Sequence, residues 1–483
     1  MKTLLFKKSL LAFLFTGIIL AGWSQEIPDS LLRYLEIAAG NNPAVLQKFN
    51  EYQAALQKVP QAGSLSDPEL SAGVFLRPME LVSGNQIADI RLMQMFPWFG
   101  VLKSAKDEMS LMANARFELF RDAKLQVYYD VQRAWYEIFK IQKDISISEK
   151  NIEILKAIER LAIVKFQAPI SSGTVTNAGR TSGNAPSSQN SGSGAAGMQS
   201  MAVSQGILSN TASMQSSRLV QSGSMEPSSG MSGLSDLYRI QIETGELQNS
   251  IEMLKNQHNT IAAKFNSYLN RPPATPVFVP DSFPLDTLSM SLLSVPDSIL
   301  ANNPMLSMLK FEGRSIDARK NMVKNMGYPM FGFGLNYSLI SKNEMSASSM
   351  NGKDMVMPMV SVTLPVYRKK YKAMITEAEL LKTAVSNNYD ATANTLQTEY
   401  YQSVQLYKDA QRRIKLYHNQ FLLASKSLDL MLKSFSTSSS SLTDLLRIRQ
   451  QVLDYELKQA EAAADLNTTT ALLKRLMASS QIN

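Results

Sequence analysis

The chain has 483 residues, a formal net charge of +8, no cysteine and two histidines. The lack of cysteine excludes disulfides, thiolate metal sites and a cysteine nucleophile. Two histidines are too few for a histidine-rich metal or catalytic centre. The basic excess is mild and spread along the chain, whereas nucleic-acid-binding proteins gather it in a stripe. There is no nucleotide-binding loop and no nucleophile with a base, so we expect no enzyme activity, no cofactor and no nucleic acid partner.

The first residues are typical of a secretory signal peptide. Basic residues precede the apolar stretch LLAFLFTGIILA, which ends shortly before a small-x-small site at residues 22–24. We expect residues 1–24 to be cleaved from the mature chain. No later stretch of about 18 apolar residues follows, so any membrane-embedded part must be built from strands.

Four segments alternate apolar with polar or small residues, which is the period of a β-strand. They lie at about 69–77, 86–96, 330–340 and 355–366. Segments of this length and pattern are typical of transmembrane barrel strands. Four strands cannot close a barrel, and open edges are unstable in lipid, so several chains must pool their strands.

Aromatic residues lie where each predicted strand pair gives way to a helix. Trp98 and Phe99 follow the first pair, and Tyr367 follows the second. Aromatic side chains at such joints are typical of the girdle that marks a membrane interface. The alternative interpretation is that they are ordinary core residues.

Two very long helices are predicted, at about 100–167 and 368–435. In the second, positions 400 to 435 taken in alternating steps of four and three are mostly apolar, which is a coiled-coil seam. A helix of this size is roughly 100 Å long. It needs a partner along its whole length, and we expect that partner to be a return helix.

Residues 168–233 are dominated by serine and glycine and contain no aromatic residue. Such a composition predicts disorder in isolation. The segment contributes five of the 26 methionines of the chain, and others lie near 345–359. Thioethers are soft ligands for Cu(I) or Ag(I), so copper or silver transport is one hypothesis. Adaptable packing by methionine is the alternative.

The return helices are predicted at about 234–270 and 442–477, and both begin with nearly the same letters, LSDLYRI and LTDLLRI. We expect Ser235 with Asp236, and Thr443 with Asp444, to be the N-cap and first-turn residues. The triplet NNP also occurs twice. The chain therefore consists of two structural repeats, residues 25–295 and 296–483, and the first repeat carries the insertion.

In this order, the motifs resemble the TolC-type outer-membrane efflux proteins. The resemblance rests on the duplicated NNP and D-L motifs together with SDPEL at 66–70, MFPWFG at 95–100, LPVY at 364–367 and AKFNSYLNRPP at 263–273. It implies a mostly α-helical chain with a transmembrane β-barrel part, four strands per protomer, and a homotrimeric tunnel in the outer membrane and periplasm. A periplasmic adaptor and an inner-membrane pump would be the partners.

The resemblance also implies a gate at the periplasmic tip. An acidic residue rings the closed mouth in that family, and Asp444 occupies its position here, with Asp236 as its first-repeat counterpart. Arg447 departs from the family pattern, since a second acid is common there. The expected function is an exit duct. The alternative is a periplasmic coiled-coil scaffold without transport activity.

Overall fold

The computed structural model describes residues 31–167, 229–280, 295–436 and 441–478. The predicted signal peptide and most of the predicted insertion, residues 168–228, lie outside the described residues. The chain divides into two compact units, one of residues 1–153 with 245–483 and one of residues 154–244.

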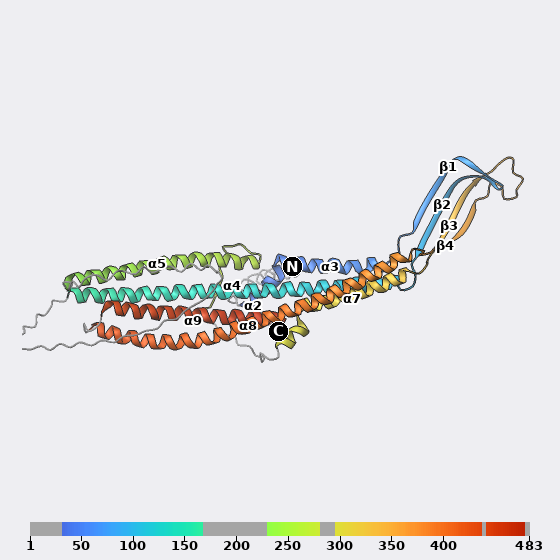
Figure 1. Ribbon diagram of the computed structural model, residues 1–483. Coiled ribbons are helices and arrows are strands. Elements are labelled where there is room, and N and C mark those ends of the chain that lie inside the picture. The colour runs from blue at the N-terminus through green and yellow to red at the C-terminus, as the bar shows by residue number, and fades with distance from the viewer. Residues whose placement is uncertain (1–30, 168–228, 281–294, 437–440, 479–483) are drawn as a thin grey trace, which may run out of the picture. The chain divides into compact units, whose positions relative to one another are not determined.

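The chain contains two runs of the same elements (Figure 1). Each run is two short helices, two strands, a very long helix and a shorter helix. The first run comprises α2 (Leu31–Asn41), α3 (Pro43–Gly63), β1 (Glu69–Leu81), β2 (Gly84–Phe96), α4 (Val101–Gln167) and α5 (Ser229–Tyr268). The second comprises α6 (Val295–Asn302), α7 (Pro304–Met326), β3 (Met330–Ser341), β4 (Met355–Thr363), α8 (Arg368–Ser436) and α9 (Leu442–Leu476). The prediction of a mostly helical chain with four strands is confirmed.

The repeated NNP triplet ties the two ends of each run together. Asn42 caps α3 by accepting hydrogen bonds from the backbone N–H groups of Ala44 and Val45, and its amide donates to the carbonyl of Tyr268 at 2.8 Å. Asn303 caps α7 in the same way, and its amide donates to the carbonyl of Leu476 at 3.3 Å. Each asparagine thus accepts hydrogen bonds from the backbone N–H groups at one helix start and donates one to a backbone carbonyl at one helix end.

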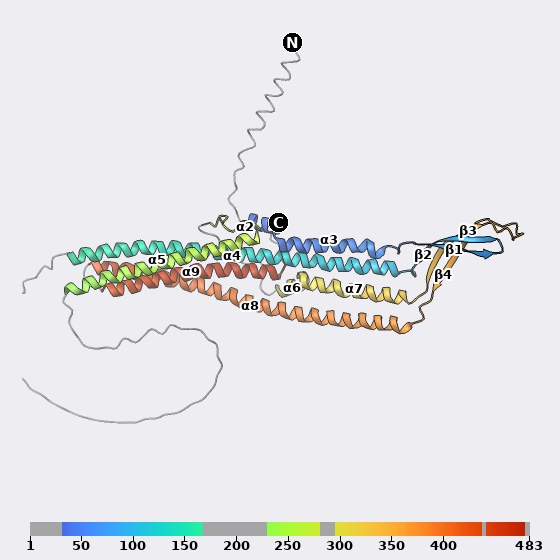
Figure 2. The same cartoon turned by 90° about the horizontal axis from the view of Figure 1, so that it is seen from above.

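The core of the larger unit lies in two clusters, one in each run. Tyr34 of α2 packs edge-on against Phe265 of α5, with ring centroids 5.0 Å apart. The second cluster joins α8 to α9, which lie side by side in Figures 1 and 2. The apolar seam residues Tyr400, Val404 and Tyr407 are buried there. Long helices are stabilised by such tertiary packing more than by their intrinsic propensity.

The four strands form one antiparallel sheet in the order β1-β2-β3-β4. The two runs meet in its centre, where β2 pairs with β3. Strand β1 extends beyond the predicted residue 77 because a register irregularity between Val74 and Met79 hides the alternation. Strand β4 ends at Thr363, earlier than the predicted residue 366, since Pro365 has no N–H group for a ladder.

The second return helix, α9, begins at Leu442 as predicted, whereas the predicted start of α5 and the predicted N-cap of α9 need correction. Helix α5 begins at Ser229, so Ser235 and Asp236 lie inside it and are not its cap and first turn. The N-cap of α9 is Ser441, whose hydroxyl accepts a hydrogen bond from the Thr443 N–H group. Asp444 does lie in the first turn of α9. None of the helices in the described part of the chain is long and apolar enough to cross a membrane.

Candidate functional site

One face of the sheet is apolar and exposed. Directly paired residues share a face, so the strand registers place Leu70, Leu92, Leu335 and Pro358 in one cross-strand row. Every second residue along each strand lies on this same face, so similar rows follow along the sheet. Leu70 and Val360 are each 68% exposed, which is far more than a water-soluble sheet leaves open at core positions. A contiguous apolar face of this kind marks an interaction with lipid or with another protein.

The opposite face carries charged and polar residues together with methionines of β2 and β4. One row contains Ser71, Arg91, Asn336 and Met357. Asp89 lies one row further along, beside Gly73. The sheet therefore separates an apolar surface from a surface that water can wet, as the alternation in the sequence predicts.

The aromatic residues at the strand–helix joint differ in their surroundings. Trp98 stacks on Tyr328 with ring centroids 5.3 Å apart and also contacts Phe331. Phe99 and Tyr367 are more than four-fifths exposed, at 85% and 81%. An open cleft of about 530 Å³, lined mainly by aromatic residues, lies at the first joint and includes Trp98 and Phe99. Phe99 and Tyr367 thus expose most of their rings, although Phe99 also contacts the Trp98 ring edge-on, and Trp98 is packed between its neighbours.

Asp444 and Arg447 both lie on the exposed side of the start of α9. Within the part of the chain that the structure describes, neither side chain forms an ion pair with the other, although their spacing of three would allow it. Asp236 is half-buried in α5 and lies in the smaller unit, so the structure does not relate it to Asp444.

Sequence reasoning missed Arg449, which is fully buried near the start of α9. Its guanidinium donates to the backbone carbonyl of Asn151 at 3.0 Å and to the side-chain oxygen at 3.1 Å, which ties α9 to α4. The Asn151 amide in turn donates to the carbonyl of Ile147. The signal was present in the sequence, because Arg449 interrupts the apolar stripe of Leu442, Leu446 and Leu453.

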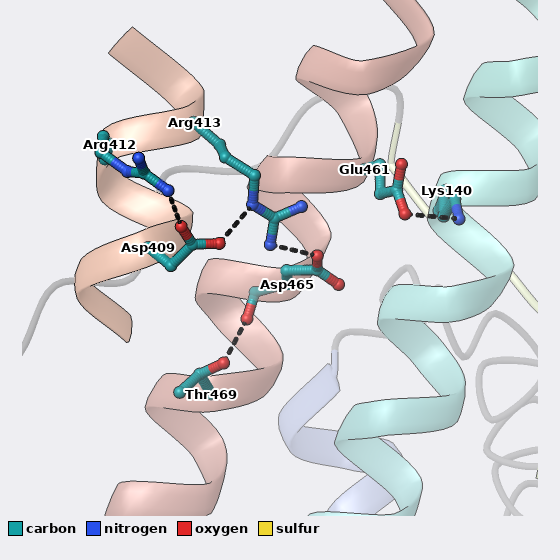
Figure 3. A network of polar contacts seen from close by, with 7 residues as sticks. All are labelled: Lys140, Asp409, Arg412, Arg413, Glu461, Asp465 and Thr469. Carbon is teal, nitrogen blue, oxygen red and sulfur yellow. Dashed lines mark hydrogen bonds and ion pairs between the residues drawn. The ribbon is translucent and has the colours of Figure 1, made fainter. Parts of the chain in front are cut away.

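Further along, a charged network holds α9 against its neighbours (Figure 3). Arg413 of α8 pairs with Asp465 of α9 at 2.8 Å and with Asp409 of its own helix at 2.9 Å. Lys140 of α4 approaches Glu461 of α9 at 3.8 Å. These pairs are partly exposed and contribute modestly to stability, but they fix the register between the helices.

Asp144, one turn after Lys140 on α4, is buried. Burial raises the pKa of its carboxyl to about 6, and the nearby Glu461 adds to the rise, while Lys140 opposes it. One carboxylate oxygen of Asp144 has no hydrogen-bond partner. A charge in this position costs free energy, so the helix packing here is favoured by the protonated acid.

No group of three or more histidine, aspartate or glutamate residues could hold a metal ion in the described residues. The predicted absence of a cofactor is a separate expectation, on which this observation does not bear. What the arrangement offers is two surfaces of different polarity and a set of polar helix contacts. These features suit passage or binding more than bond-breaking chemistry.

Comparison with solved structures identifies the architecture. The outer-membrane channel OprN matches with a TM-score of 0.66 and 13% identity, over 93% of this chain and 90% of that chain. The outer membrane protein VceC of Vibrio cholerae matches with a TM-score of 0.66 and 11% identity, over 93% and 96%. The MtrE outer membrane channel of Neisseria gonorrhoeae, in an open state, matches with a TM-score of 0.65 and 11% identity, over 93% and 88%.

This chain has the fold of the outer-membrane channels. No protein-family model and no curated protein sequence matches it. The resemblance that the sequence motifs indicate is thus confirmed at the level of fold, over nearly the whole chain. The matched structures are channels and not enzymes, in agreement with the expectation from the sequence.

We predict that Asp144→Asn stabilises the protein at pH 7.5. The folded pKa of about 6 lies above the ordinary aspartate pKa of 3.8, so the favourable contribution of the neutral acid is present below pH 4 and is lost as the pH rises through 6. The gain at pH 7.5 should be at most roughly 3 kcal/mol. It is measured as a rise in Tm.

The matched control is Asp429→Asn, because Asp429 is exposed on α8. This variant should have the same Tm as the wild type at pH 7.5. Equal melting of the Asp144 variant and the wild type at pH 7.5 would show that the buried carboxyl carries no penalty.

Proposed function

We propose that this protein is the outer-membrane exit duct of a tripartite efflux or export system. Three copies would pool four strands each into one barrel, and their long helices would form a tunnel in the periplasm. The single observation that supports this most strongly is the sheet with one exposed apolar face and one polar face. The fold shared with outer-membrane channels agrees with it.

The two faces fit a barrel wall. The rows containing Leu70 and Val360 would face lipid, since exposing them to water is unfavourable by roughly 25 cal/mol for each Å². The rows containing Asp89 and Arg91 would face a water-filled lumen. Phe99 and Tyr367 would lie at the membrane interface, with Trp98 anchoring the joint.

The sheet edges account for the proposed trimer. Strands β1 and β4 are the outer strands of the sheet. Their outward backbone groups would be unsatisfied in lipid, and each costs several kcal/mol there. Pairing β1 of one copy with β4 of the next satisfies both edges at once and closes the ring.

The helices would extend into the periplasm and dock at their tip on an adaptor protein, which couples the duct to an inner-membrane pump. We place the gate at the start of α9, with Asp444 and Arg447 at the mouth. The buried bonds of Arg449 to Asn151 hold this part of α9 against α4, so opening requires them to stretch or break. The chain itself would perform no chemistry, and the pump would supply the energy.

The cargo is a finer proposal. Abundant thioethers favour soft metal cations such as Cu(I) or Ag(I) over polypeptides or drugs. A periplasmic scaffold is the alternative function. The exposed apolar face of the sheet disfavours it, because a soluble scaffold would leave that face in water.

We predict that cysteines on the two sheet edges link chains into trimers. The natural chain has no cysteine, so introduced thiols are the only ones present. Ser71→Cys on β1 is combined in turn with Met355→Cys, Met357→Cys or Met359→Cys on β4. Disulfides form only when Cα atoms lie about 4.4–6.8 Å apart. At least one pair should give a covalent trimer after oxidation of membranes, seen on a non-reducing gel.

Each single-cysteine variant is the matched control, because one thiol per chain can link no more than two chains. If every double variant stops at the products of the single variants, β1 and β4 of neighbouring copies are not paired, and the shared barrel is wrong.

We predict that Asp444→Ala raises single-channel conductance in a planar bilayer. Removing the exposed carboxylates at the mouth should weaken the contacts and bound counterions that keep it closed. Asp429→Ala, an exposed acid elsewhere on the helices, serves as the control. Unchanged conductance and unchanged closing of the Asp444 variant would contradict the gate role while leaving the duct intact.

A further inference from the structure

Two glycines of β3, Gly332 and Gly334, lie on the polar face of the sheet between methionines of β2 and β4. Neither has a side chain, so side chains of the neighbouring strands can lie over them. Met93 and Met95 of β2 lie on one side, paired with Gly334 and Gly332. Met359 and Ser361 of β4 lie on the other side, paired with the same two glycines. Three methionines and one serine are therefore the cross-strand partners of two glycines.

The side chains of Met93, Met95 and Ser361 approach the position above Gly332. A Cβ atom on Gly332 would lie 2.6 Å from the sulfur of Met95 and 3.6 Å from the sulfur of Met93, and it would also meet the Ser361 hydroxyl. A Cβ atom on Gly334 would lie 3.3 Å from the terminal methyl group of Met93. The two glycines thus allow a close approach that any other residue would block.

The sulfur atoms of Met93 and Met95 point toward one place. The Ser361 hydroxyl lies 3.6 Å from the sulfur of Met93 and 3.8 Å from that of Met95, and it is the donor to both. Thioether sulfur is a weak hydrogen-bond acceptor. The hydroxyl has one hydrogen to donate, so the two sulfurs are alternative acceptors that lie near the same oxygen atom. Met359 lies in the same cross-strand row as Met93, with Gly334 between them.

We propose that Met93, Met95 and Met359 form a binding site for a soft monovalent cation, Cu(I) or Ag(I), with the Ser361 hydroxyl beside it. Soft thioether ligands select such ions over Mg²⁺ or Ca²⁺, which prefer oxygen ligands. No protons or electrons are exchanged on binding, because thioethers carry no proton to lose.

A role in packing alone explains this cluster less well than cation binding does. Methionine used as a core filler is buried, whereas Met93, Met95 and Met359 are half-buried on a polar face. The charges around them are mixed. Glu69 is paired with Met93, and Asp89 and Arg91 follow along β2. An ion can therefore reach the sulfurs without crossing a uniformly basic surface.

The location gives the site a use, and this step rests on the proposed function. In a duct whose lumen is lined by the polar face, the copies would together carry a ring of such sites inside the barrel. Weak binding there would suit a cation in transit, since conduction needs sites that both accept and release the ion.

The first test uses the full chain in detergent and Cu(I) alone. Cu(I) is titrated without oxygen against a coloured chelator. The variant M93L/M95L/M359L should bind one Cu(I) fewer per chain than the wild type. Leucine has nearly the volume of methionine, so the substitutions should cost little stability. The control M79L/M253L/M326L removes three methionines elsewhere and should bind as the wild type does.

A second test uses the wild type, which avoids any doubt about folding of the variant. Ag(I) should protect Met93, Met95 and Met359 from peroxide oxidation, as measured by peptide mass spectrometry. Met345 and Met350, which are 95% and 54% exposed in the β3–β4 connection, should oxidise at unchanged rates.

Three results would overturn the site: no Cu(I) binding by the wild type, equal binding by the cluster variant, or equal loss in the control variant. Failure of the proposed duct is a different outcome. It would show as absence of cross-linked trimers while Cu(I) binding to the cluster remains.

Discussion

Unpaired backbone groups along a strand edge are the constraint on which this structure depends. The sheet has two such edges, β1 and β4. It also has an exposed apolar face, for which contact with water is unfavourable. Lipid would cover the apolar face, and closure of the sheet by further copies of the same chain would pair both edges. In the proposed assembly, the polar face would line a passage that the helices after each strand pair would continue.

The repeats in the sequence are explained by the same geometry. Each run supplies one strand pair and one pair of long helices, and the two runs meet where β2 pairs with β3. Asn42 and Asn303 close the two runs in equivalent ways, each joining a helix start to the end of a return helix. The duplicated NNP is thus a structural clamp as well as a mark of the repeat. Loss of one clamp should loosen one half without changing the strand pattern.

Local periodicity made much of this fold predictable. The alternation in 330–340 and the seam from Tyr400 to Phe435 are properties of consecutive residues, so strands and long helices could be predicted from them. The strand registers, the burial of Arg449 and the approach of Met93 and Met95 to Gly332 could not, because they depend on segments far apart in the chain. Ser235 and Asp236 were wrongly predicted to begin a helix, since α5 extends upstream into a region whose composition predicted disorder. Short helices α3 and α7 were missed, although Asn-Pro is a cap signal.

The most direct test of the account is negative-stain electron microscopy of the protein extracted from membranes in detergent. The account predicts a threefold particle with a detergent belt and a tube of roughly 100 Å, the length of α4 and α8 at 1.5 Å per residue. A soluble, rod-like particle without a belt would contradict it. That result would leave the helices as drawn and remove the barrel, the shared edges and the lumen.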